Sequence, residues 1–110
     1  MYKRQLKKAV TDFPKSRRAS FAQNLLGRSY LDDNKPSLAS IAFYDSYKKY
    51  PDGERAPESL FYLGQSLMKL NKPADACTAY RELTEVYGAK LAPDRKAEVA
   101  RARAAAKCDS

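Results

Sequence analysis

The amino-acid sequence repeats itself with a period of 37 residues, and this internal repeat limits the chain to a small set of folds. Shifted by 37 positions, the stretch 34–36 (Asn-Lys-Pro) falls on 71–73 (Asn-Lys-Pro) and the pair 26–27 (Leu-Gly) falls on 63–64 (Leu-Gly). The pair 13–14 (Phe-Pro) likewise falls on 50–51 (Tyr-Pro). A repeat of this length is typical of solenoids, in which each supersecondary unit covers the hydrophobic face of its neighbour. We therefore expect stacked copies of one unit.

The residue composition indicates that each unit is helical. The chain has 17 Ala, the strongest helix former, against 3 Val and 1 Ile, which strands favour. Apolar residues recur at helical spacing, and Pro36 and Pro73 stand where a second helix would begin. We predict an all-α solenoid with full helix-turn-helix units at residues 18–50 (helices 18–31 and 36–50) and 55–87 (helices 56–70 and 73–87). A half repeat at residues 2–13 precedes them, and a capping helix at 93–107 follows, within a single domain over residues 1–110.

The absence of His limits the chemistry available to the chain. Without imidazole there is no Ser-His or Cys-His pair and no His-ligated metal. Two Cys that lie 31 positions apart cannot fill a tetrahedral zinc site by themselves. The sequence also contains no apolar run of about 18 residues, which a membrane span needs. We therefore predict no catalytic activity, no metal, no cofactor and no direct membrane insertion.

The formal net charge of +8 raises the question of nucleic-acid binding. Eight basic residues and one acidic residue lie within positions 1–28, whereas positions 29–89 hold seven basic and nine acidic residues. A groove that binds phosphates would concentrate its cations on the concave surface of the repeats. Because the repeat centre is slightly acidic, we interpret the charge as solvated helix surface and expect no nucleic-acid partner.

The two units resemble tetratricopeptide repeats, which are helical hairpins with small and large residues at fixed positions. The matching residues are Leu26, Gly27, Tyr30, Ala39, Phe43 and Pro51 in the first unit, and Leu60, Leu63, Gly64, Ala76 and Tyr80 in the second. The second unit departs from the pattern at Leu67, Leu83 and Gly88, and the period exceeds the usual length of about 34 residues. The pattern implies that paired Gly and Ala residues let two helices approach, while an aromatic ring fills the gap to the next unit.

A narrower resemblance rests on the segment from Tyr50 to Leu67, where Tyr-Pro-Asp-Gly-Glu-Arg-Ala-Pro-Glu-Ser-Leu leads into Tyr-Leu-Gly-Gln-Ser-Leu. It is similar to the C-terminal domain of the YbgF/CpoB family, periplasmic Tol-Pal system proteins also called cell division coordinators. The similarity extends from about Leu6 to Cys108. The resemblance implies binding to TolA, a further contact with the peptidoglycan synthesis machinery, and a role in coordinating outer-membrane constriction with peptidoglycan synthesis. It also implies a signal peptide and a trimerising coiled coil ahead of this sequence, so we expect a C-terminal fragment of a longer protein.

The sequence pattern also fits two alternatives to this family. Outer-membrane assembly lipoproteins of the BamD type share a similar sequence pattern, which would make the chain a module of such a lipoprotein. A generic tetratricopeptide adaptor of another compartment is the second alternative.

The two cysteines give information on the cellular compartment of the protein. Cys77 falls early in the second helix of the last unit, and Cys108 falls just after the capping helix. If that helix packs antiparallel on its neighbour, the two thiols come close enough for a disulfide once the end of the helix bends. A disulfide would favour the periplasm over the cytosol. The alternative is a buried free thiol at Cys77 and an incidental thiol at Cys108.

The candidate binding surface is the concave face of the solenoid, lined by the first helix of each unit. Such surfaces bind an extended segment or a helix of a partner protein. The residues expected to face this groove are Phe21, Asn24, Arg28 and Leu31 in the first unit, and Glu58, Phe61, Gln65 and Met68 in the second. An alternative interpretation buries Phe21 and Phe61 between helices. Tyr44 and Tyr62 fall outside the matched positions and are further candidates for contact residues.

Overall fold

Each repeat unit folds into a pair of antiparallel helices in the computed structural model, which describes residues 17–108. The first pair is α2 (Arg17–Asp32) and α3 (Pro36–Lys49), and the second is α4 (Ala56–Lys69) and α5 (Pro73–Tyr87). A short 3-10 helix, η1 (Gly88–Lys90), leads to α6 (Pro93–Ala105). The described residues contain no strand, so the prediction of an all-α solenoid is confirmed. The expected half repeat at residues 2–13 lies outside the described residues.

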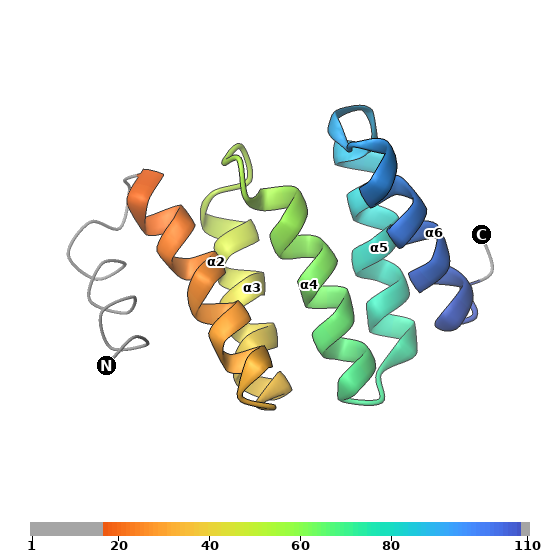
Figure 1. The fold of residues 1–110 in the computed structure, drawn as a ribbon, viewed down its shortest axis with the longest axis horizontal. Coiled ribbons are helices and arrows are strands. Elements are labelled where there is room, and N and C mark those ends of the chain that lie inside the picture. Colours follow the sequence, from red (N-terminus) through yellow and green to blue (C-terminus); the bar gives the residue numbers. More distant parts are fainter. Residues whose placement is uncertain (1–16, 109–110) are drawn as a thin grey trace.

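The helices stack side by side in two layers (Figure 1). The first helices of the units, α2 and α4, lie in one layer with α6, and α3 and α5 lie behind them. We call the first the A layer and the second the B layer. Consecutive helices pack on one another, and α2 also contacts α4 directly. The helix α6 therefore takes the position of a third A helix.

Three helices of the A layer end in the same turn, which returns the chain toward the B layer. At the end of α2, Asn34 adopts a positive φ of 60°, and the backbone N–H of Lys35 donates to the carbonyl of Tyr30 at 2.8 Å. Asn71 repeats this turn with a φ of 59° after α4. Asn tolerates this left-handed conformation better than most residues, and the backbone hydrogen bond satisfies a carbonyl at the helix end. The repeated Asn-Lys-Pro therefore ends one helix and begins the next.

The core is built from the residues that match the tetratricopeptide pattern. The rings of Phe43 and Tyr80 are fully buried, and each lies against the glycine of the preceding helix, Gly27 or Gly64. A Cβ atom on either glycine would come closer than 3.0 Å to the facing ring. Ala39 and Ala76 are also fully buried. Small residues on one helix thus make room for an aromatic ring on the next.

The linker between the two units is attached to α5 by a hydrogen bond. The Tyr87 hydroxyl donates to the carbonyl of Pro51 at 2.6 Å.

A chain of buried polar side chains connects the first three helices. The Nδ2 atom of Asn24 in α2 donates to the Ser59 hydroxyl in α4 at 3.0 Å, and that hydroxyl donates to the Ser46 hydroxyl in α3 at 3.0 Å. All three side chains are buried. Buried polar groups are costly unless they are paired, so this chain favours one arrangement of the three helices.

Candidate functional site

The A layer presents six of the eight predicted groove residues at least partly to solvent. Arg28 and Leu31 come from α2, and Gln65 and Met68 come from α4; Arg28 is exposed and the other three are half-buried. Phe21 is 41% exposed, so the structure does not bury it between helices. Glu58 is half-buried at the start of α4. These residues follow one face of each helix because they recur at intervals of three and four positions.

Asn24 does not face the groove. Its side chain is fully buried and donates to Ser59, so it connects α2 to α4 and cannot meet a partner. The helical spacing placed Asn24 on the A-layer face, but α4 packs directly against this part of α2 and covers it. The sequence prediction for this residue is corrected accordingly.

Phe61 lies largely in the core, as the alternative interpretation of the sequence proposed. Its side chain is 5% exposed, and its ring lies 5.4 Å from the Tyr62 ring and 6.2 Å from the Tyr80 ring. The Arg95 guanidinium of α6 covers it, with its central carbon 4.5 Å from the ring centroid. Phe61 therefore forms part of the groove floor and offers a partner little area of its own.

Two arginines lie over aromatic rings where α2 meets α4 and the linker before it. Arg28 lies 5.3 Å from the Tyr62 ring centroid, and Arg55 lies 4.6 Å from that of Phe21. Glu58 holds the two arginines together, because one carboxylate oxygen is 3.0 Å from Arg55 and the other is 3.9 Å from Arg28. Tyr62 was a sequence candidate, whereas Arg55 was missed because it precedes α4 in the linker.

Two cavities lie between α4 and α6, and together we call them the α4–α6 groove. One has a volume of about 370 Å³ and is lined by Phe61, Gln65, Met68, Tyr80, Glu98, Arg101, Ala102 and Ala105. The other has a volume of about 390 Å³ and is lined by Glu54, Arg55, Pro57, Glu58, Lys90, Leu91, Ala92 and Arg95. Four of the predicted residues, all from α4, therefore line the groove, and α6 supplies its opposite wall.

The contribution of α6 was missed, although the sequence carried a signal for it. The sequence prediction treated α6 as a cap over the last unit. Shifting the four predicted α4 residues by the 37-residue period gives Arg95, Glu98, Ala102 and Ala105. All four line the α4–α6 groove. Applying the repeat to α6 would have found them, and the structure shows that α6 serves as a groove wall as well as a cover.

The B layer carries a second, more apolar surface that the groove prediction did not include. A cavity of about 410 Å³ lies between α3 and α5, lined by Ser40, Ile41, Tyr44, Tyr47, Leu60, Leu63, Leu67, Asp75, Thr78, Ala79 and Glu82. Ile41 is 60% exposed and Tyr44 is 49% exposed. Burial, together with the hydrogen bond and negative charge of Glu82, raises the pKa of Tyr47 to about 12. The Tyr47 hydroxyl is therefore a neutral group at physiological pH.

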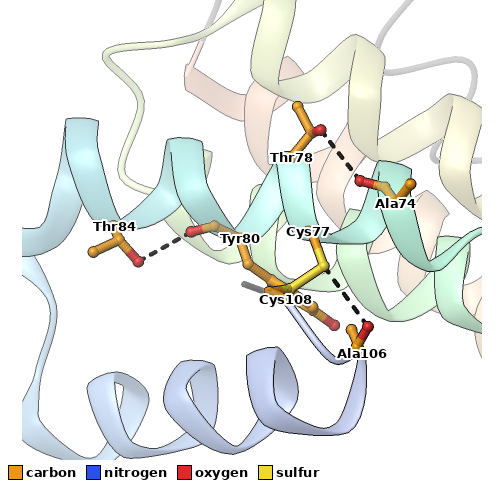
Figure 2. Close-up of a disulfide and its surroundings, with 7 residues drawn as sticks. All are labelled: Ala74, Cys77, Thr78, Tyr80, Thr84, Ala106 and Cys108. Carbon is orange, nitrogen blue, oxygen red and sulfur yellow. Dashed lines mark hydrogen bonds between the residues drawn. A yellow bond between two sulfur atoms is a disulfide. The ribbon is translucent and has the colours of Figure 1, made fainter. Parts of the chain in front are cut away.

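Cys77 and Cys108 form a disulfide that joins α5 to the segment after α6 (Figure 2). The turn that ends α6 brings the two cysteines together. Lys107 has a φ of 59°, and the N–H of Cys108 donates to the carbonyl of Arg103 at 3.0 Å. This is the turn that Asn34 and Asn71 make after α2 and α4. The sequence predicted that the two thiols meet once the end of the capping helix bends, and this turn provides that bend.

The described part of the chain offers no metal site and no membrane span. Within residues 17–108, no three His, Cys, Asp or Glu side chains are grouped as a metal site requires. None of the helices in this range has both the length and the apolar character needed to cross a bilayer.

The comparisons with known proteins agree with the repeat architecture. The family model described as "Tetratricopeptide repeat" matches residues 58–88, which run from the first turn of α4 to the residue after α5. No curated protein and no solved structure matches the chain. Tetratricopeptide repeats are typically non-catalytic modules for protein–protein interaction, and no catalytic family matches. A tetratricopeptide repeat thus occupies residues 58–88, within a helical array that has the architecture of a repeat solenoid.

Proposed function

We propose that the chain is a protein-binding module whose α4–α6 groove receives an extended segment of a partner protein. The observation that carries this proposal is the groove itself, which has an apolar floor of Phe61, Met68 and alanines and a charged rim. Peptide grooves combine such a floor, which supplies area, with a few polar groups that fix orientation. The arginines and rings of the neighbouring α2 surface extend the same face.

The partner and the cellular role are proposed from the sequence resemblance. The segment Tyr50–Leu67 is similar to the YbgF/CpoB family, which favours TolA as the partner and a role in coordinating outer-membrane constriction with peptidoglycan synthesis at cell division. The periplasm is the proposed compartment. The Cys77–Cys108 disulfide supports this compartment, because disulfides persist in oxidising environments and are rare in the cytosol.

Calorimetric titration with the periplasmic part of TolA tests the proposal. Met68 is half-buried in the groove, so Met68→Asp places a charge on its apolar floor without disturbing a fully buried position. We expect this variant to bind at least about tenfold more weakly, which is the typical effect of a central interface residue. The matched control is Val86→Asp, which adds the same charge on α5 at a side chain that is 58% exposed. It should bind within about twofold of the wild type.

The possible outcomes separate the parts of the proposal. If the wild-type protein does not bind TolA, the Tol-Pal assignment fails. If TolA binds but Met68→Asp has no more effect than Val86→Asp, the assignment stands and the groove is wrong. Salt-sensitive DNA binding without TolA binding would favour a nucleic-acid adaptor in place of both.

A further inference from the structure

The strongest unexplained feature of the α4–α6 groove is the hydroxyl of Tyr80. The Tyr80 side chain is fully buried, and its hydroxyl has no hydrogen-bond partner among the described residues. Tyr80 leaves α5 on the side that faces α6 (Figure 2) and lines the 370 Å³ cavity. Buried hydroxyls are usually paired, so an unpaired one at a cavity wall indicates a ligand group that is received there.

The first repeat unit shows that packing does not require this hydroxyl. Phe43 is the repeat equivalent of Tyr80, and its ring lies against Gly27 as that of Tyr80 lies against Gly64. Both side chains are fully buried. The phenyl ring fills the same place without a polar atom and stacks on Tyr62 at 5.7 Å. The two positions differ in that Tyr80 lines the cavity beside α6 and carries a donor.

A second unpaired donor lies at the other end of the groove. The Nη1 atom of Arg95 is buried and has no hydrogen-bond partner in the described part of the chain. The Arg95 side chain lines the 390 Å³ cavity and covers Phe61, which lines the other cavity. Both unpaired atoms at the groove are therefore donors, and both side chains lie against the Phe61 ring. Such a pair selects a ligand that brings acceptors.

The charges of the groove favour an anionic acceptor. Burial raises the pKa of Tyr80 to about 12, so its hydroxyl remains a donor at physiological pH. Arg101 lines the same cavity, and the Glu98 carboxylate lies 3.7 Å from Arg95, which offsets its charge. The two cavities together are lined by four basic residues and three acidic ones, and two of the acidic ones, Glu58 and Glu98, already form ion pairs with arginines. Hydrogen bonds to a carboxylate are stronger than those to a neutral oxygen.

We propose that the α4–α6 groove is a carboxylate subsite, in which the Tyr80 hydroxyl and the Arg95 and Arg101 guanidinium groups receive Asp or Glu side chains of an extended partner segment. This inference rests on the proposed protein-binding function and adds the chemistry of the partner. The occupant is an acidic, extended peptide, since donors that line two successive cavities of one groove suit acceptors spaced along one chain. The competing outcomes are that the groove binds a neutral peptide equally well, or that acidic peptides are attracted only nonspecifically by the positive charge.

Two synthetic peptides provide the test, one with alternating Glu and Leu and one in which Gln replaces every Glu. Binding is measured by fluorescence anisotropy, and the contacted residues are mapped by NMR chemical shifts. We expect the Glu peptide to bind at least about tenfold more tightly than the Gln peptide and to shift the amides of Phe61, Gln65 and Ala102. Tyr80→Phe, which copies Phe43, should weaken the Glu peptide about tenfold and leave the Gln peptide nearly unchanged.

Two controls distinguish a binding role of these groups from a structural or purely electrostatic one. Tyr80→Phe removes an unpaired buried hydroxyl, so the free protein should be at least as stable as the wild type, whereas a structural hydroxyl would make it less stable. Arg101→Gln should weaken the Glu peptide several-fold more than Lys96→Gln, which removes an equal charge from α6 at an exposed side chain that does not line either cavity.

The outcomes distinguish this inference from the proposed function. Equal affinity for both peptides, or no effect of Tyr80→Phe, overturns the carboxylate subsite even if the groove amides shift. The same holds if neither peptide shifts these amides. The protein-binding function is judged separately by TolA titration with Met68→Asp, so either proposal can fail while the other stands.

Discussion

Gly64 and Tyr80 set the distance between the two helices of the second unit. A Cβ atom at Gly64 would come closer than 3.0 Å to three atoms of the Tyr80 ring, and this ring is fully buried. We expect Gly64→Ala to lower the free energy of unfolding by about 1–3 kcal/mol, the usual cost of overpacking a core. Gly27→Ala should act in the same direction, because its Cβ would meet the Phe43 ring. Urea denaturation measures both changes.

Gly88 is the matched control for this prediction. It follows α5 with helical backbone angles (φ −53°, ψ −41°), and nothing lies within 4 Å of an added Cβ. Gly88→Ala should therefore leave the protein unchanged or stabilise it by up to about 1 kcal/mol, through the lower entropy of the unfolded chain. If Gly64→Ala and Gly88→Ala have the same effect, the close contact between Gly64 and Tyr80 does not limit the packing.

Individual residues show where sequence patterns succeed and where they fail. Helical spacing placed Gln65 and Met68 on one face of α4, and both line the α4–α6 groove, because the face on which a residue lies depends only on its position along the helix. It failed for Asn24, because burial there depends on the approach of α4, which the spacing within α2 does not contain. The unpaired donors of Tyr80 and Arg95 likewise depend on three-dimensional packing.

At the scale of the elements, the α-helices within residues 17–108 begin and end within two residues of the predicted positions. This accuracy comes from residues with a direct local effect: Pro36, Pro73 and Pro93 each stand at the first position of a helix. Asn34 and Asn71 adopt the positive φ that ends the preceding helix. The turn after α6 has Lys107 in place of Asn, and for this reason its similarity to the other two turns could not be read from the sequence.

The attachment of α6 leads to a prediction for the disulfide. Apart from the disulfide, α6 and the residue after it are held mainly by the buried side chains of Val99 and Ala106 and by the contact between Arg95 and Phe61. Cys77 and Cys108 are 31 positions apart, and closing a loop of this size contributes about 3.5 kcal/mol to the free energy of unfolding. Reduction should lower the stability by about that amount and make Arg101 and Arg103 the first sites of tryptic cleavage.

A serine variant provides the control for this prediction. The Cys77→Ser, Cys108→Ser protein should have the stability of the reduced wild type and should not respond to reductant. Thiol titration of the denatured, unreduced protein should find no free thiol. Two free thiols would remove both the stabilisation and the argument for an oxidising compartment.

At the scale of the whole molecule, the two helical interfaces differ although the sequence repeats. Asn24, Ser46 and Ser59 form a buried polar chain between α2, α3 and α4. One period later, Phe61, Leu83 and Lys96 replace Asn24, Ser46 and Ser59, so this hydrogen-bonded chain is not repeated at the second interface. The repeat thus predicts the architecture, while the chemistry of each interface depends on residues that the repeat does not keep. The α4–α6 groove lies at the second interface, and this is why its chemistry had to come from the structure.

The stability of the whole fold should fall at alkaline pH through its buried tyrosines. The pKa of Tyr80 is raised by burial to about 12, and that of Tyr87 is raised by burial and by the charges of Asp52 and Glu82. An unfolded chain releases these protons near pH 10. Because the folded pKa is the higher one, this stabilisation is complete below about pH 10 and is lost as the pH rises toward about 12. Two units of pKa correspond to about 2–3 kcal/mol for the fully buried Tyr80.

Urea denaturation of the wild type and Tyr80→Phe across this pH range isolates the contribution of Tyr80. Both proteins carry the same remaining titratable groups, so their contribution cancels in the comparison. We expect the two stability curves to run parallel up to about pH 10 and then to diverge, with Tyr80→Phe retaining about 2–3 kcal/mol more at about pH 12. Curves that remain parallel to the end of the range would mean that water reaches the Tyr80 hydroxyl, and the groove would then lack the buried donor on which the carboxylate subsite depends.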